Sequence, residues 1–209
     1  MNQRRKIDAL KDQLSLLSLL YKLKERNFQT KRLKLQKLVY LADVFGAILD
    51  RKPTAYTFRV YKLGPFTEEI YTDIERLVSL GLTKAKEMEQ WTPEQERSFK
   101  YEITEYGISR IGKILDMSDF LIREKAIEFS ILVAGHLSGT NIRKLVYSEP
   151  NYMKAQKQGF ESIIDPSYES AIEFKRMSKT IALEEYELKL SEDEILWLYL
   201  NFMKLIQSQ

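Results

Sequence analysis

Few side chains in this sequence are of types and spacings that could support catalysis. His136 is the single histidine of the chain, and an isolated imidazole is more often a structural group or a helix-end cation than a catalytic base. The tripeptide Glu187-Leu188-Lys189 matches half of a nuclease motif, with Asp165 as the nearby upstream acid. A helix is predicted between them, where a nuclease places paired strands. A metal-dependent nuclease is therefore only a distant alternative.

The residues that other enzyme classes need are missing from the sequence. There is no cysteine, which excludes disulfides, zinc–thiolate sites and thiol catalysis. The sequence also has no glycine-rich phosphate loop, no nucleophile elbow and no run with metal-ligand spacing. We therefore predict a protein that is not an enzyme, with no catalytic residue, no bound metal and no cofactor.

Composition indicates a globular protein with a basic amino-terminal end. The 209 residues are 44% hydrophobic, which is enough to bury a core. No signal peptide and no apolar run of about 20 residues is found, so we expect a soluble cytoplasmic protein without a membrane span. Residues 1–37 hold eleven Lys or Arg and three acidic residues, whereas the remainder holds 22 and 27. The basic end could attract nucleic acid, an anionic membrane or an acidic protein.

The stretch from residue 33 to residue 82 organises the predicted fold. Apolar residues three and four apart between Leu35 and Phe45 predict an amphipathic helix with a basic outer face, capped by Thr30. Alternation over residues 56–62 predicts a half-buried strand. The Gly64-Pro65 pair predicts a corner, with a new helix beginning at Pro65 or just after and ending at Gly81.

The flanking segments are predicted to be helical apart from one hairpin. Residues 1–27 form a leucine-rich helix, and residues 82–103 form a hairpin whose tip carries Trp91. Thr104 is predicted to cap a helix to about residue 117. Further helices follow, interrupted by a loop through Pro150, Gly159 and Asp165-Pro166, and the last helix has a capping box at Ser191. The order helix, helix, strand, helix, hairpin resembles a winged-helix domain. We therefore predict a mainly α protein with three parts: an amino-terminal helix over residues 1–27, a winged-helix-like domain over 28–117, and a carboxy-terminal helical bundle over 118–209.

Two short motifs in the central stretch resemble those of a known family. The pairing of Leu35-Gln36-Lys37-Leu38-Val39-Tyr40 with Tyr61-Lys62-Leu63-Gly64-Pro65-Phe66, followed by Leu80-Gly81-Leu82, is similar to the Panacea (SocA-like) antitoxin domain and to YwgA-like proteins. The resemblance covers roughly residues 30–112. It implies an interaction module that neutralises or delivers a partner protein, in a toxin–antitoxin or phage-defence setting.

The motif residues are accordingly the predicted partner-binding residues. Gln36, Lys37 and Tyr40 lie at the edge of the apolar stripe, where polar and aromatic groups can contact a partner. The partner is a toxin or another complex subunit, and a second copy packed through the amino- or carboxy-terminal helices is an alternative. The full predicted set is Gln36, Lys37, Tyr40, Tyr61, Lys62, Gly64, Pro65 and Trp91.

A DNA-binding regulator is the main alternative function. Winged helices commonly insert their third helix into the major groove. Here that helix carries Glu68, Glu69, Asp73 and Glu75 against Arg76, which is the wrong sign for approach to phosphates. Any nucleic-acid contact is expected on another face, made by Lys31, Arg32 and Lys34.

Overall fold

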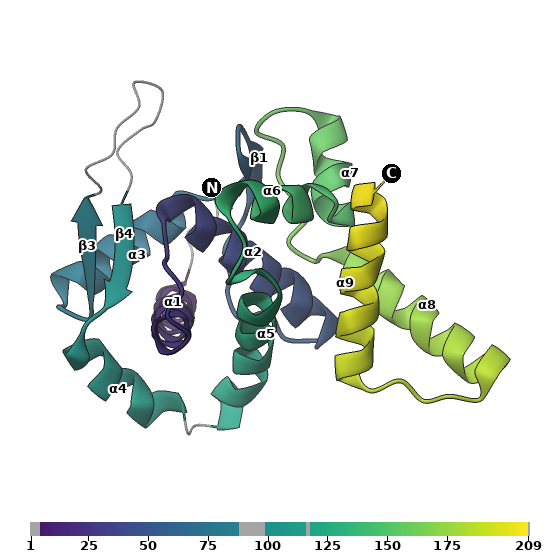
Figure 1. Cartoon of the computed structure of the whole chain (residues 1–209), viewed down its shortest axis with the longest axis horizontal. Helices are drawn as coiled ribbons and strands as arrows, with labels where there is room; N and C mark the ends of the chain where they lie inside the picture. The colour runs from purple at the N-terminus through teal and green to yellow at the C-terminus, as the bar shows by residue number, and fades with distance from the viewer. Residues whose placement is uncertain (1–4, 88–98, 116–117, 209) are drawn as a thin grey trace.

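The computed structural model describes residues 5–87, 99–115 and 118–208. These residues form nine helices and two antiparallel two-stranded hairpins, which confirms the predicted mainly helical class (Figure 1). The elements are α1 (Lys6–Glu25), α2 (Arg32–Ile48), β1 (Arg59–Tyr61), β2 (Gly64–Phe66), α3 (Glu69–Ser79), β3 (Thr83–Glu87), β4 (Phe99–Ile103), α4 (Glu105–Leu115), α5 (Ser118–Ala134), α6 (Gly139–Tyr147), α7 (Pro150–Gln158), α8 (Glu169–Tyr186) and α9 (Glu192–Ser208).

Helix α2 is the central element of the core. All its residues from Leu35 to Ile48 are buried, and it packs against α5, α6, α8 and β2. The expected basic outer face is therefore wrong beyond the first turn. The predicted cap is also wrong, because Lys31 precedes the helix and no side chain caps it. The carbonyl of Thr30 instead accepts a hydrogen bond from the Tyr101 amide at 3.0 Å.

The Gly64-Pro65 corner forms a hairpin and does not start a helix. Strands β1 and β2 pair Arg59 with Phe66 and Tyr61 with Gly64, and α3 begins only at Glu69. Gly64 has φ +98°, the positive value expected of this turn. The alternation predicted over residues 56–62 is confirmed by burial as far as Tyr61, but the strand itself covers only Arg59–Tyr61. A third backbone segment joins β1, because the Val60 amide donates to the Ser162 carbonyl at 2.9 Å.

The predicted hairpin at residues 82–103 is confirmed as β3–β4, with Lys84 opposite Glu102. The segment between α1 and α2 pairs with β4 through an antiparallel bridge between Lys31 and Lys100. The Thr104 cap of α4 is also confirmed, since the Gly107 amide donates to its hydroxyl at 3.0 Å. The hairpin tip, including Trp91, lies outside the described residues.

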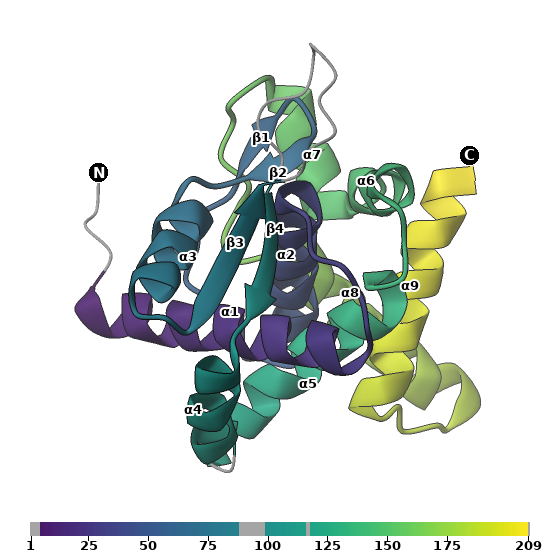
Figure 2. The ribbon, with the colours of Figure 1, turned by 60° about the vertical axis from the view of Figure 1, so that its left-hand side comes forward.

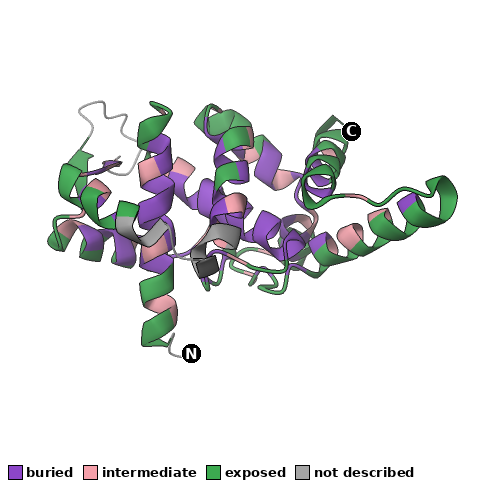
Figure 3. Ribbon diagram, turned by 90° about the horizontal axis from the view of Figure 1, so that it is seen from below, coloured by how far each residue is buried: buried purple, intermediate pink, exposed green. Residues whose placement is uncertain are grey.

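Helix α1 divides into an exposed start and a buried remainder. Ile7 and Leu10 are exposed, whereas the leucines from Leu16 to Leu23 are buried against α3, α4, α5 and β4. Figure 2 shows α1 running across the foot of the β3–β4 hairpin. The first turns of α1 project from the molecule in Figure 3.

The carboxy-terminal region contains one helix that the sequence analysis missed. The stretch around Pro150 and Gly159 was predicted to be a loop, but α7 spans it. Proline at the first helical position and glycine at the end are helix start and stop signals. The capping box of α9 is confirmed: Ser191 and Glu194 exchange hydrogen bonds between their backbone amides and side chains.

One buried cluster runs through the molecule from Leu16 of α1 to Met203 of α9. Helix α5, which begins at Ser118, packs on both α1 and α2. The carboxy-terminal helices therefore share a core with the segments before residue 117. Within the described ranges, no helix is long and apolar enough to cross a membrane.

Candidate functional site

The α2 motif residues lie in the interior and not at an exposed edge, so that expectation is wrong. Gln36, Lys37 and Tyr40 are all at most 2% exposed. The Gln36 amide donates to the carbonyl of Thr67 at 2.6 Å and accepts from its amide at 3.1 Å. This two-way pairing satisfies the backbone just before α3. The side chain therefore fixes the start of α3 relative to α2.

Lys37 joins α2 to the β1–β2 hairpin. Its Nζ donates to the carbonyl of Pro65 at 2.7 Å, and a Cβ on Gly64 would stand only 3.2 Å from its Cε. Burial, reinforced by the nearby positive charge of Arg143, lowers the pKa of Lys37 to about 7. Lys37, Gly64 and Pro65 are thus brought together as one interior contact.

Tyr40 joins α2 to a buried carboxylate that the sequence analysis did not single out. Glu149 is fully buried and caps α7, accepting hydrogen bonds from the Tyr152 amide at 2.8 Å and the Asn151 side chain at 2.6 Å. The hydroxyls of Tyr199, at 2.8 Å, and of Tyr40 also donate to it. Burial raises the pKa of both tyrosines well above the ordinary value, so they remain donors. An acid directly before Pro150 was the available sequence signal.

Two other predicted partner-binding residues reach the surface. Lys62 is exposed in the β1–β2 turn. Tyr61 is partly buried, with its ring stacked on Phe66 at 4.9 Å and 5.2 Å from that of Phe160, which is exposed. Pro65 is buried with Gly64. The described members of the predicted set therefore mainly hold the fold together.

The predicted nucleic-acid residues are not equally available. Lys31 is exposed, but the Arg32 guanidinium lies 3.8 Å above the Tyr71 ring. Lys34 is partly buried, which lowers its pKa, and its Nζ lies 5.8 Å from the Phe28 ring centre. Of these three side chains, only Lys31 is exposed and has no contact with an aromatic ring within the described residues.

The acidic face predicted for α3 needs one correction. Asp73 is buried, and its carboxylate accepts hydrogen bonds from Gln13 and Tyr56, each at 2.8 Å. Glu68 and Glu75 are exposed. The outward charge of α3 is therefore less negative than the sequence indicates.

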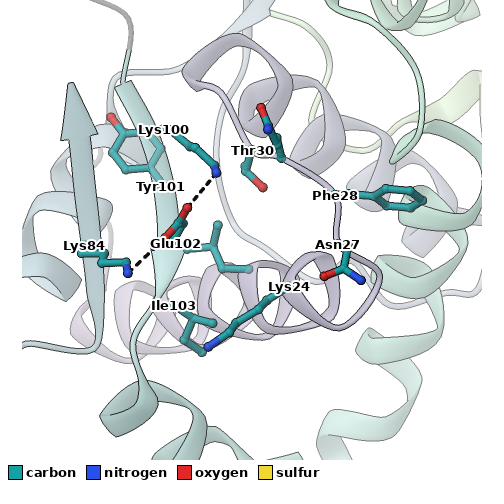
Figure 4. A pocket seen from close by; sticks show the side chains of 11 residues that line it. Lys24, Asn27, Phe28, Thr30, Lys84, Lys100, Tyr101, Glu102 and Ile103 are labelled. Atoms are coloured by element: carbon teal, nitrogen blue, oxygen red, sulfur yellow. Dashed lines mark ion pairs between the residues drawn. The ribbon is translucent and has the colours of Figure 1, made fainter. Parts of the chain in front are cut away.

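A basic hollow of about 320 Å³ lies between the end of α1, the α1–α2 connection and the β3–β4 hairpin (Figure 4). Lys24, Lys84 and Lys100 line it, together with a single carboxylate. That carboxylate, Glu102, is 2.7 Å from the Nζ of Lys100 and 3.1 Å from the Nζ of Lys84. The hydrogen bonds from the two lysines, Lys100 first, lower the pKa of Glu102 to about 2.

Among the residues that the structure describes, exposed apolar side chains are most numerous on the last two helices. The rings of Phe174 and Phe202 stack at 5.2 Å and hold α8 against α9. Residues three, four or seven apart share a side of a helix, so the apolar side chains continue from this stack along both helices. We call this set the C-terminal apolar surface: Phe174, Met177 and Ile181 of α8, with Leu198, Phe202 and Leu205 of α9.

The exposure of this surface is large for apolar groups. Met177 is 59% exposed and Leu205 is 63% exposed. Only Ala171 and Ala182 are buried along α8, and Figure 3 shows its later turns projecting beyond the body. The neighbouring face of α9 is buried through Ile195, Tyr199 and Met203, among others. An exposed apolar patch of this kind is typical of an interaction site.

The candidate catalytic groups are not brought together. Asp165 precedes α8 and Glu187 follows it, so the two carboxylates are separated by a helix about 27 Å long at 1.5 Å per residue. His136 is exposed in the turn after α5. Across the described ranges, no three histidine, aspartate or glutamate side chains are grouped to hold a metal ion.

Comparison with known proteins does not identify a function for this chain, so a functional assignment depends on the geometry described above. No protein-family model matches the chain, and no curated protein is found to be similar to it. The family resemblance of the α2 and β1–β2 motifs therefore stays a prediction.

Proposed function

We propose that this chain is a non-enzymatic interaction module that binds a partner protein through the C-terminal apolar surface. The observation that carries the proposal is the exposure of Met177, Ile181 and Leu205 beside the Phe174–Phe202 stack. Burying apolar area is the main favourable term in protein association, and aromatic and methionine side chains are enriched at interfaces. The antitoxin-like role implied by the motif resemblance is consistent with this mode of action.

We further infer that residues 28–117 form a winged-helix-like domain. Three features support this: the order of the extended segment at Lys31, α2, α3, β3 and β4; the pairing of that segment with β4; and the hairpin that follows α3. Helix α1 lies before these bounds and packs on α3, α4 and β4 as the first of the three helices. In this arrangement β1–β2 is an insertion between the second and third helices. The buried motif residues Gln36 and Lys37 hold this insertion and α3 in place.

The proposed partner element is an amphipathic helix with acidic residues along one flank. Two helices joined by an aromatic stack offer an apolar strip that matches the apolar stripe of a third helix. Arg176 is exposed on α8 and forms no ion pair within the described chain. A hollow of about 260 Å³ beside Arg176 is lined by Met177, Thr180 and Ile181. Acidic side chains of the partner would complement the charge of Arg176.

Co-purification tests the proposal. The tagged chain is co-expressed with the product of the adjacent gene, where a toxin–antitoxin setting would place the partner. The test variant Met177→Glu/Leu205→Glu adds two charges to the surface. The control, Leu10→Glu/Leu132→Glu, adds two charges at exposed helical positions elsewhere.

We expect stoichiometric partner with the wild type and the control, and at least tenfold less with the test variant. Equal recovery with both variants, or no partner recovered with the wild type, contradicts the proposal. Circular dichroism of each variant checks that the helical fold is retained.

A further inference from the structure

Three lysines form a row across the β3–β4 hairpin and the neighbouring connection. Lys86 of β3 pairs with Lys100 of β4, and Lys100 pairs with Lys31 of the α1–α2 connection. Residues directly opposite one another in antiparallel strands point to the same face of the sheet. Because adjacent strands are about 4.8 Å apart, the row spans only about 10 Å between its outer Cα atoms.

This arrangement is unfavourable without an anion. Like charges directly opposite each other destabilise a strand pair. Lys100 is paired with Glu102, and that single carboxylate is shared with Lys84. Lys31 and Lys86 are exposed and form no ion pair within the part of the chain that the structure describes. The face therefore carries four lysines and one glutamate, and we call it the basic sheet face: Lys31, Lys84, Lys86, Lys100 and Glu102.

We propose that the basic sheet face binds the phosphate backbone of double-helical nucleic acid, a function beyond protein binding. Lysine rows supply the sequence-independent electrostatic part of such binding. Single-stranded nucleic acid is bound with aromatic side chains on which bases stack. Phe99 and Tyr101 alternate with Lys100 and Glu102 and point to the other face of β4. On β3 and β4, the basic sheet face therefore offers lysines to phosphates but no aromatic side chain on which a base could stack.

The two binding surfaces lie at different ends of the molecule. Figure 1 shows the β3–β4 hairpin on one side and the α8–α9 pair on the other. A duplex on the basic sheet face therefore leaves the C-terminal apolar surface accessible. Failure of one proposal does not affect the other.

Fluorescence anisotropy with a labelled 20-base-pair DNA duplex of mixed sequence tests the proposal at 50–200 mM salt. Four lysine–phosphate contacts predict a slope of log K against log salt of about −3.6, so affinity falls roughly a hundredfold over this range. Lys31→Gln/Lys86→Gln removes the two unpaired cations. We expect at least tenfold weaker binding and a slope shallower by about two.

The matched control is Lys157→Gln/Lys189→Gln, which changes the net charge equally at exposed positions outside the basic sheet face. It should bind as the wild type does. Parallel titrations with duplex RNA show whether the bound duplex is DNA or RNA, since both present a phosphate backbone. Binding of either duplex supports the proposal. Absence of duplex binding at 50 mM salt, equal loss in the control, or equal affinity for single-stranded DNA or polyglutamate overturns it.

Discussion

Tyr40 donates its hydroxyl proton to the carboxylate of Glu149, 109 residues further along the chain. The bond joins α2 to the start of α7, and Tyr199 brings α9 to the same carboxylate. The orientation of α7 and α9, and with it that of the C-terminal apolar surface, therefore depends on a contact with α2.

Removing the Tyr40 hydroxyl should destabilise the fold. Tyr40→Phe leaves Glu149 with one donor fewer in a buried site, which should cost about 1–3 kcal/mol because a buried acceptor loses a partner. Urea denaturation measures the free energy of unfolding. Tyr186→Phe, at an exposed position of α8, is the control and should change it by less than about 0.5 kcal/mol. Equal effects of the two changes would show that the buried carboxylate does not depend on Tyr40.

Lys37 should make stability rise with pH above neutrality. The folded-state pKa is about 7, below the ordinary 10.5, because burial and Arg143 disfavour the charged form. Between these two values the unfolded chain binds the extra proton, so the free energy of unfolding increases with pH. Lys37→Met should remove this rise, and its stability relative to the wild type should be greatest near pH 6. The urea midpoints of both proteins at pH 6, 8 and 9.5 measure this difference in stability. A difference that does not change with pH would contradict the prediction.

Asp43 should have the opposite effect below neutrality. Burial raises its folded-state pKa from 3.8 to about 7, although Lys52 and the hydrogen bonds from Thr54 oppose the shift. The folded chain therefore holds the proton over that range, and stability falls as pH rises from about 4 to 7. Asp43→Asn should become progressively more favourable, relative to the wild type, across this window. Thermal melts across this pH window measure the difference, and the control Glu173→Gln, on an exposed face, should show no such trend.

Gly64 should tolerate alanine less well than Gly81. Both have positive φ, +98° and +70°, but a Cβ on Gly64 would stand 3.0 Å from Cε1 of Tyr147, whereas one on Gly81 meets no atom within 4 Å. The backbone cost of about 1–2 kcal/mol is common to both. Gly64→Ala should lose about 1 kcal/mol more, as in other overpacked sites. Similar unfolding midpoints for the two variants would contradict this prediction and would show that the interior next to Lys37 can accommodate a methyl group.

Much of the fold follows from local sequence signals, and the site does not. Periodicity located α2, the β3–β4 hairpin and the Ser191 capping box, because spacing and caps are local properties. Burial of Gln36, Lys37 and Tyr40 could not be predicted in this way, since their partners Thr67, Pro65 and Glu149 are 28–109 residues away. The pairing of Lys31 with Lys100 likewise depends on a tertiary contact.

The most direct test of protein docking uses the absence of cysteine from the chain. A single cysteine is introduced by Met177→Cys on the C-terminal apolar surface or by Leu132→Cys on α5, and each thiol is labelled with a maleimide. The account predicts that a co-purified partner slows labelling at position 177 at least tenfold and leaves that at position 132 unchanged. Unchanged labelling at position 177 in the partner complex would contradict it.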